Sequence, residues 1–178
     1  ASPAKRIRKL RDSSPQMSPE ICRQVQLDQL ILPGWQLMKL VKDLLPAEEK
    51  SRISLELLQQ WDGQLTPESV GGTVFQVFME QLSTALLEQK IPVSLQVKLL
   101  GTGISANLHP VNEFQGYLVP NLLRILQHLP PAWIESRFAR DEMILRCLAQ
   151  TTTYLQNRMG DDPTSWQWGQ LHQVTFKH

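Results

Sequence analysis

Residues 66–92, TPESVGGTVFQVFMEQLSTALLEQKIP, indicate the fold class of this chain most directly. Their large apolar side chains recur at the three- and four-residue spacing of one helix face. These side chains are Phe75, Phe78, Met79, Leu82 and Leu86. Thr66-Pro67-Glu68 is typical of a helix start, and Ile91-Pro92 is typical of a stop. Gly71 and Gly72 weaken the helix near its start, which a close approach by another part of the backbone would explain.

The rest of the chain repeats this pattern of apolar-faced segments separated by Pro and Gly. Leu is abundant and β-branched residues are sparse in most segments, which favours helix over strand. The predicted helices cover residues 4–12, 19–32, 35–45, 47–61, 66–90, 111–129 and 141–159, and residues 93–99 fit either a short strand or a helix. A chain of 178 residues can bury about 70% of its unfolded surface. We therefore predict one all-α domain over residues 1–178, an irregular multi-helix bundle with short connections.

Local signals set the expected ends of these helices. Ser18 before Pro19 is typical of an N-cap, and Asp141 is the N-cap candidate of the last long helix. The expected stops are Gly63, Pro130-Pro131 and Gly160, and Pro33-Gly34 is expected to end or kink the helix before it. The last long helix has its predicted inner face at Ile144, Cys147, Leu148, Thr151 and Leu155. Pro120 is expected to kink or split the helix over residues 111–129.

Residues 162–178, DPTSWQWGQLHQVTFKH, hold two of the chain's five Trp and two of its four His. Trp is large and rare, so Trp166 and Trp168 beside an Asp-Pro turn indicate a fixed structural junction. From His172 to His178 polar and apolar residues alternate, which predicts a short strand at the C-terminus. The run stops without a closing turn, so we expect the chain to be a piece of a longer protein.

Charge is balanced overall, with 18 Lys and Arg against 17 Asp and Glu, so no basic field indicates nucleic-acid binding. The exception is an N-terminal cluster of five basic residues. Its members are Lys5, Arg6, Arg8, Lys9 and Arg11. Such a run favours a solvated helix face, and contact with phosphate or an acidic partner is the alternative. Ile7 and Leu10 lie on one side of this helix and would let it dock weakly.

The two cysteines, Cys22 and Cys147, match no metal-binding spacing. Each lies on a predicted helix among apolar residues, which favours buried inert thiols, with a disulfide as the alternative. No apolar run is long enough to span a membrane, and no signal peptide is evident. We therefore predict no membrane contact.

Two serines lie in incomplete catalytic motifs. Gly103-Ile104-Ser105 is half of a G-x-S-x-G nucleophile elbow, but the last Gly is missing, which favours a plain loop serine. Ser2 and Lys5 match S-x-x-K without the partner motifs of that site. Asp161-Asp162 precede Pro163, so a turn is the simpler interpretation of this carboxylate pair.

The histidines give no metal-binding pattern. They are His109, His128, His172 and His178. None is paired with another at i, i+4, and none lies at ligand spacing from a Cys or carboxylate. The residues by themselves thus predict no catalytic, cofactor-binding or metal-ligating group in this chain.

Four stretches together resemble the penicillin acylase (penicillin amidase) family. Residues 160–178 are similar to the family run LG-dP…W-x-WG-x-LH…F-x-H. Residues 4–7, AKRI, resemble RA-x-RI, and residues 25–28, VQLD, resemble LQ-x-D. Residues 57–63, LLQQWDG, resemble LL-x-x-WDG, and Ser69 follows where a DS pair is common. The resemblance extends over essentially the whole chain.

The resemblance implies an N-terminal-nucleophile hydrolase. In that family a precursor cuts itself to expose a Ser at the start of the β chain. The Ser hydroxyl attacks an amide carbonyl, and its own α-amino group, whose pKa is near neutral, acts as the base. Backbone N–H and an Asn side chain hold the oxyanion. None of these groups maps onto this chain. Some members have an Arg near the substrate, and the corresponding position in this chain is Pro3.

This hypothesis predicts a helical fragment of a β chain that is inactive alone. Its partners would be the sandwich core and α chain of a parent that hydrolyses linear amides, such as acyl side chains of β-lactams or acyl-homoserine lactones. The resemblance implies a periplasmic or secreted parent that can bind calcium, with no cofactor in this fragment. An apolar patch is expected where the sandwich packs, and it could cause dimerisation of the isolated fragment. The alternative is a stand-alone helical interaction module with a basic N-terminal helix.

Overall fold

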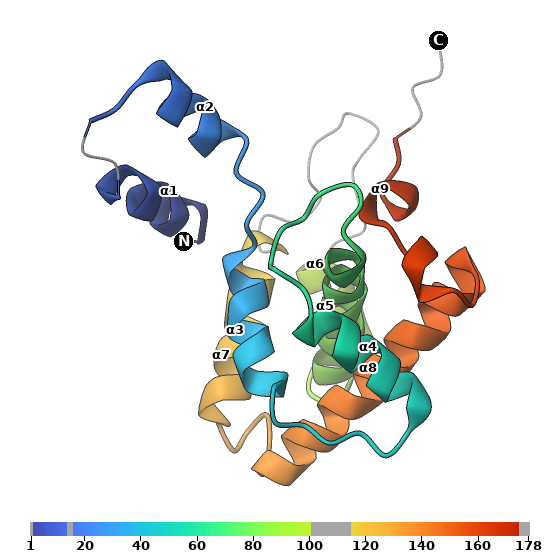
Figure 1. Cartoon of the computed structure of the whole chain (residues 1–178). Helices are drawn as coiled ribbons and strands as arrows, with labels where there is room; N and C mark the ends of the chain where they lie inside the picture. The colour runs from blue at the N-terminus through green and yellow to red at the C-terminus, as the bar shows by residue number, and fades with distance from the viewer. Residues whose placement is uncertain (1, 14–15, 101–114, 175–178) are drawn as a thin grey trace.

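The computed structural model describes residues 2–13, 16–100 and 115–174, and these residues confirm the all-α prediction (Figure 1). The α-helices are α1 (Ser2–Asp12), α2 (Pro19–Gln26), α3 (Leu32–Val41), α4 (Glu49–Gln59), α5 (Val70–Glu88), α6 (Val93–Leu100), α7 (Gln115–His128), α8 (Arg137–Met159) and α9 (Trp168–Leu171), with a 3-10 turn η1 (Pro163–Ser165). Over these ranges the only β pairing is an isolated antiparallel bridge between Leu30 and Gln64. No helix in the described part of the chain is long and apolar enough to cross a membrane.

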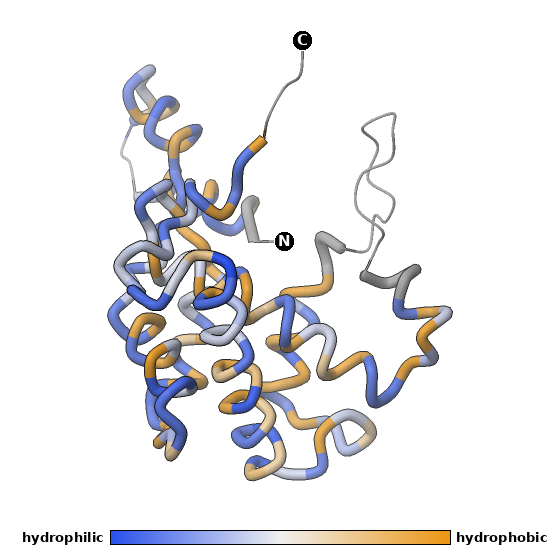
Figure 2. The backbone as a smooth tube through the Cα atoms, turned by 90° about the vertical axis from the view of Figure 1, so that its right-hand side faces the viewer, coloured by the Kyte–Doolittle hydropathy of each residue, from blue (hydrophilic) through white to orange (hydrophobic). Residues whose placement is uncertain are grey.

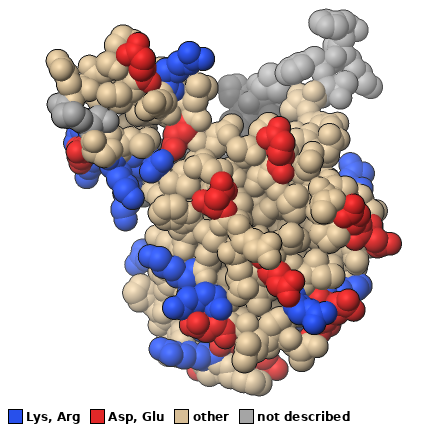
Figure 3. All heavy atoms as spheres, in the orientation of Figure 1, with Lys and Arg blue, Asp and Glu red and all other residues tan. Residues whose placement is uncertain are grey.

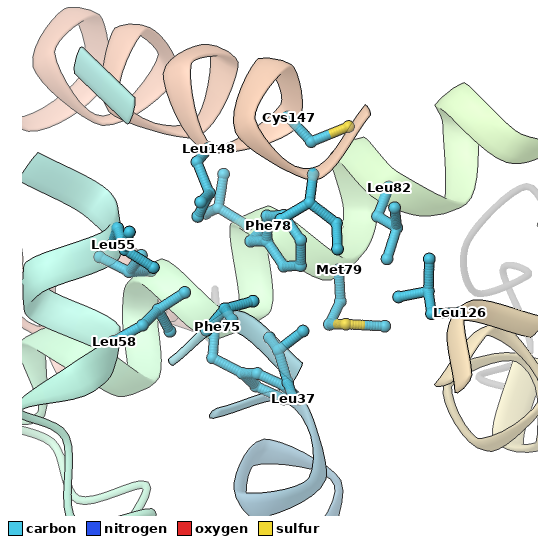
Figure 4. Close-up of a cluster of buried hydrophobic side chains, with 14 of the residues drawn as sticks. Leu37, Leu55, Leu58, Phe75, Phe78, Met79, Leu82, Leu126, Cys147 and Leu148 are labelled. Atoms are coloured by element: carbon cyan, nitrogen blue, oxygen red, sulfur yellow. The ribbon is translucent and has the colours of Figure 1, made fainter. Parts of the chain in front are cut away.

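Helix α5 lies at the centre of the packing. Helix α8 packs along both α4 and α5, while α7 packs on α3 and α5. Side chains from four neighbouring helices converge on α5 in Figure 4. They include Leu37 of α3, Leu58 of α4, Leu126 of α7 and Leu148 of α8, all fully buried. Because every contributing helix buries one face, orange and blue alternate along the tube in Figure 2.

The apolar faces predicted for the two longest helices are confirmed. All five residues of the α5 face are buried, from Phe75 to Leu86. The five predicted for α8, from Ile144 to Leu155, are fully buried as well. Helical periodicity succeeds here because a long helix in contact with several others must keep one continuous stripe against the core.

The predicted helix starts are right for α2 and wrong for α5 and α8. Ser18 caps α2, with its Oγ accepting from the Ile21 N–H at 3.3 Å. The cap of α5 is Ser69 rather than Thr66, and the cap of α8 is Ser136 rather than Asp141. In both, the serine hydroxyl accepts a hydrogen bond from the backbone amide three residues on. Asp141 instead lies inside α8, where it pairs with the adjacent Arg140.

The helix predicted over residues 19–32 is too long. Helix α2 ends at Gln26; Leu27 lies in a turn, and Leu30 forms an isolated bridge with Gln64. The Ile31 N–H donates to the Gly63 carbonyl at 2.8 Å, which offers that segment a partner outside a helix. Pro33 does not stop a helix but lies in the first turn of α3, where its missing N–H costs nothing.

The described residues also test the expectations for residues 93–99, for the prolines of α7 and for two glycines. Residues 93–99 lie in a helix, α6, and not in a strand. Pro120 lies inside α7 without splitting it, and α7 ends just before Pro130-Pro131, where Leu129 takes a positive φ of 48°. Gly63 and Gly160 have the predicted positive φ values, 85° and 95°. Gly160 caps the C-terminus of α8, whereas Gly63 lies in the loop after α4, which already ends at Gln59.

The strand predicted at the C-terminus is wrong as far as the structure describes it. His172 follows the short helix α9, and no strand forms up to Val174. The remainder of that prediction, residues 175–178, lies outside the described residues. The alternation was misleading because α9 places Trp168 and His172 one helical turn apart, on the same side.

Trp61 explains one glycine at the start of α5, Gly71, and one in the first turn of α3, Gly34. Its indole is largely buried, at 8% exposure, between the first turns of α3 and α5. A Cβ on Gly71 would lie 2.5 Å from Trp61 Cγ, and one on Gly34 would lie 2.8 Å from Cη2. Both distances are far inside van der Waals contact. The expected approach of another backbone segment is therefore wrong at Gly71, where the close neighbour is the Trp61 side chain.

We predict that Gly71→Ala lowers the free energy of unfolding by about 1–3 kcal/mol because the added methyl overpacks against the base of the Trp61 side chain. The higher helix propensity of Ala acts in the opposite direction and would stabilise the protein by up to about 1 kcal/mol. The sign of the change in the free energy of unfolding therefore shows whether overpacking or helix propensity is larger. Urea unfolding followed by tryptophan fluorescence measures the change. Glu80→Ala, on the exposed face of α5, is the matched control, and a stabilised Gly71→Ala would contradict the packing described here.

Candidate functional site

Most residues singled out for chemistry are not brought together. Ser105, His109 and His178 lie outside the described residues. His128 is exposed at the end of α7, far in sequence from His172, whose ring stacks on Trp168. Asp162 caps the turn η1 and accepts from the Thr164 N–H and hydroxyl, which lowers its pKa. Over the ranges that the structure describes, no three His, Cys, Asp or Glu side chains are grouped to hold a metal ion.

The two cysteines differ, and neither is in a disulfide. Cys147 is fully buried in the core, and burial raises the pKa of its thiol to about 11, as expected of an inert thiol. The same prediction for Cys22 is wrong, because that thiol is exposed. Helix α2 projects from the body in Figure 1 and has no buried residue, so its apolar neighbours do not cover Cys22.

The first two family-like stretches are joined by one ion pair. Arg6 Nε and Nη2 donate to the two carboxylate oxygens of Asp28, each at 2.8 Å. The two side chains are only 19% and 15% exposed. The hydrogen bonds from Arg6 lower the pKa of Asp28, and they raise the pKa of Arg6 in turn. This bidentate pair fixes α1 to the segment after α2.

The second stretch is joined in turn to the third. Just after Asp28, the Gln29 carbonyl accepts from the Leu65 N–H at 3.0 Å, which pairs this segment with the loop that follows residues 57–63. In that loop, Trp61 Nε1 donates to the Gln64 carbonyl at 2.8 Å. Trp35 Nε1 donates to the Asp62 carbonyl at 3.2 Å, so both indoles hold the loop.

The third stretch meets the tryptophan-rich fourth. The Gly169 N–H donates to the Pro67 carbonyl at 2.7 Å, and the Trp168 N–H donates to the Ser69 carbonyl at 3.2 Å. A Cβ on Gly169 would lie 3.1 Å from Pro67 Cβ, so the two backbones approach as closely as a glycine allows. The start of α9 is thereby bonded to the start of α5.

The two tryptophans of the fourth stretch have different roles. Trp166 is fully buried, and its Nε1 donates to the Gly160 carbonyl at 2.8 Å, which closes the turn after α8. Trp168 is partly exposed and stacks on His172, with ring centres 4.7 Å apart and planes 7° from parallel. This end of the described chain is thus a fixed junction, as the sequence predicts for its Trp residues.

These contacts form one connected series from α1 to α9 across the upper part of the molecule in Figure 1. Every linking atom is a structural donor, acceptor or packing group, and no nucleophile and base lie together in it. Sequence reasoning missed the Arg6–Asp28 pair and the backbone pairing of Pro67 with Gly169. A carboxylate within an otherwise largely apolar stretch of sequence, as Asp28 is between Leu27 and Leu30, is the signal that could have indicated a partly buried cation.

The comparisons with known proteins agree with this arrangement. The sequence profile of the penicillin amidase family matches residues 3–178. The acyl-homoserine lactone acylase QuiP of Pseudomonas fluorescens is 24% identical over 156 residues, which cover 82% of this chain and 18% of that protein. A thermostable penicillin G acylase from Alcaligenes faecalis has a similar fold, with a TM-score of 0.64 and 19% identity, over 93% of this chain and 33% of that one.

A match over nearly all of its length shows that the chain belongs to the penicillin amidase family. The chain spans well under half the length of the relatives it matches. The similar structure, at 19% identity, supports the fold and not a substrate.

We predict that Asp28→Asn weakens the docking of α1 by about 1–2 kcal/mol at pH 7, because it removes a charge-assisted pair that is mostly covered. The folded-state pKa of Asp28 is lowered, so its contribution is present above its ordinary pKa of about 3.9 and is lost as the pH falls through the folded value. Hydrogen exchange of the α1 amides measures both effects.

The adjacent Arg11–Asp12 pair is the matched control for this prediction. Its side chains are 60% and 56% exposed, so Asp12→Asn should change α1 protection little. Equal effects of the two substitutions, or protection of wild-type α1 that does not decline in acid, would contradict the role given to Asp28.

We also predict that Trp166→Ala costs more stability than Trp168→Ala. Removing the fully buried indole of Trp166 leaves a cavity and an unpaired Gly160 carbonyl, for about 3–5 kcal/mol. Trp168 is partly exposed and keeps its backbone bond to Ser69 in either variant. Thermal unfolding of both variants tests the order, and a larger loss for Trp168→Ala would refute it.

Proposed function

We propose that this chain is the helical part of a larger amide hydrolase that cleaves linear amides with an N-terminal Ser nucleophile located outside these 178 residues. The observation that carries this proposal is the family match over residues 3–178. The Arg6–Asp28 pair and the contacts around Trp61 and Gly169 support a structural role, because they hold the helices in one arrangement.

In the proposed reaction the Ser hydroxyl attacks the amide carbonyl and its proton passes to the Ser α-amine. An ester bond forms, the C–N bond breaks, and the proton is delivered to the departing amine. Water then attacks the acyl-enzyme while the α-amine accepts its proton. The ester C–O bond breaks, the carboxylic acid leaves, and the proton returns to the Ser oxygen. The names of the relatives suggest acyl-homoserine lactones or penicillin G as substrates, and both carry a linear acyl amide.

The exposed apolar side chains do not define the single patch that the resemblance predicts. The exposed large apolar side chains in the described part are Ile7, Met17, Leu27, Trp35, Leu45, Val93, Leu95, Phe138, Tyr154 and Val174. They are distributed over helices α1, α3, α6 and α8 and the segments that flank them. Scattered exposure of this kind is normal for a folded protein, so these residues give no support to a particular contact with the rest of a larger enzyme.

The test is hydrolysis of a panel of phenylacetyl and acyl-homoserine-lactone amides by the full-length processed protein. We expect turnover by that protein and none by the 178-residue chain, because the chain contributes no activated nucleophile. Replacing the N-terminal Ser of the β chain by Ala should abolish turnover. Ser105→Ala, in the elbow-like stretch, is the control that should retain it, and loss of turnover in Ser105→Ala would sink the proposal.

A further inference from the structure

Basic side chains gather on the flank formed by α1 and α3. Lys5, Arg8 and Lys9 are exposed on α1, and Lys39 is exposed on α3. Blue atoms accordingly collect on the left side of the space-filling view in Figure 3. The overall charge of the chain is only +1, so this flank concentrates positive charge that the rest of the surface balances.

Several cations of this flank have partners, and others do not. Arg6 is paired with Asp28, Arg11 with Asp12, and Lys42 with Asp43 at 3.9 Å. The ammonium of Lys9 lies 5.8 Å from the centre of the Trp35 ring. Among the residues that the structure describes, no carboxylate lies within ion-pair distance of Lys5, Arg8 or Lys39.

A groove lies between two of these unpaired lysines. Its volume is about 290 Å³, and Lys5 from α1 and Lys39 from α3 line it. The apolar part of its lining is Leu32, Pro33, Trp35 and Pro120. No acidic residue lines it. We call it the α1–α3 groove. Its volume suits one or two side chains, and both lysines beside its apolar lining are exposed.

We propose that the α1–α3 groove docks an acidic peptide segment in which an apolar side chain is flanked by carboxylates. The apolar side chain would cover Pro33, Trp35 and Pro120, and the carboxylates would pair with Lys5 and Lys39. This inference rests on the proposed function, because the segment is assigned to the part of the larger enzyme outside these 178 residues. The similar acylase structure has about two thirds of its chain beyond the matched region.

The ion pair of Arg6 with Asp28 gives the groove its shape. Lys5 is adjacent to Arg6 on α1, so the pair that fixes α1 also fixes one wall of the groove. The cation–π contact of Lys9 with Trp35 holds the same helix to α3. The groove is therefore formed before any partner arrives, which favours a defined docking site over a loose charged surface.

The experiment is zero-length carbodiimide cross-linking of the purified full-length protein, followed by mass spectrometry. This reagent joins a lysine amine only to a carboxylate in direct contact. We expect Lys5 and Lys39 to link to Asp or Glu residues outside these 178 residues, at least fivefold more often than the exposed control Lys90. Raising the salt concentration to 1 M should reduce these links several-fold.

Two results would overturn the inference. One is that Lys5 and Lys39 link no more often than Lys90. The other is that their links go only to carboxylates inside these 178 residues or to a second copy, which mixing of isotope-labelled and unlabelled protein distinguishes.

A variant pair gives a second readout that does not depend on the cross-linker. Lys5→Glu combined with Lys39→Glu should make the linked segment at least fivefold more sensitive to limited proteolysis, because its carboxylates lose their partners. Lys42→Glu, a charge reversal outside the groove lining, is the matched control and should leave that sensitivity unchanged. Equal sensitivity in all three proteins would refute the docking site.

Hydrolysis of acyl amides is measured on the same samples. Turnover without links from Lys5 and Lys39 would refute the docking site and leave the proposed function intact. Links from Lys5 and Lys39 without turnover would support the docking site and contradict the proposed function.

Discussion

The burial of Trp61 is the constraint on which most of this structure depends. Its indole leaves no room for a Cβ at Gly34 or Gly71, so the first turns of α3 and α5 pack against it only with glycine at these positions. Its ring also packs on Phe75, with centres 5.3 Å apart, and its Nε1 holds the loop that leads into α5. One side chain thus sets the relation of three helices, because a rigid aromatic group permits few arrangements around it.

In the described structure, the stretches that resemble the family contact one another through packing and hydrogen bonds. Arg6 and Asp28 fix α1, and Gly169 bonds the end of the described chain to the start of α5. Such residues are restricted because each depends on a partner far away in the sequence, and replacing one leaves a buried polar group or a clash. Family membership is therefore readable from a part of the protein to which we assign no catalytic group.

The sequence predicted helices well where a long apolar face meets the core, as along α5 and α8. It failed at places that depend on distant partners. The segment after Gln26 leaves the helix because the loop around Gly63 offers it backbone hydrogen bonds. The N-caps of α5 and α8 were misplaced because Ser, Thr and Asp are all acceptable caps, and only the actual geometry selects the hydroxyl that reaches the free amide. No catalytic residue was predicted in this chain, and that prediction is still to be tested.

The sequence by itself determined the helical class, the buried faces, the structural character of the tryptophan-rich end and the family. These depend on local periodicity and on rare residues whose size or backbone freedom restricts their surroundings. Only the tertiary structure decided that Arg6 pairs with Asp28, that Cys22 is exposed, and that Lys5 and Lys39 line one groove. Each of these features depends on how separate helices pack against one another. Spacing along the chain does not determine it.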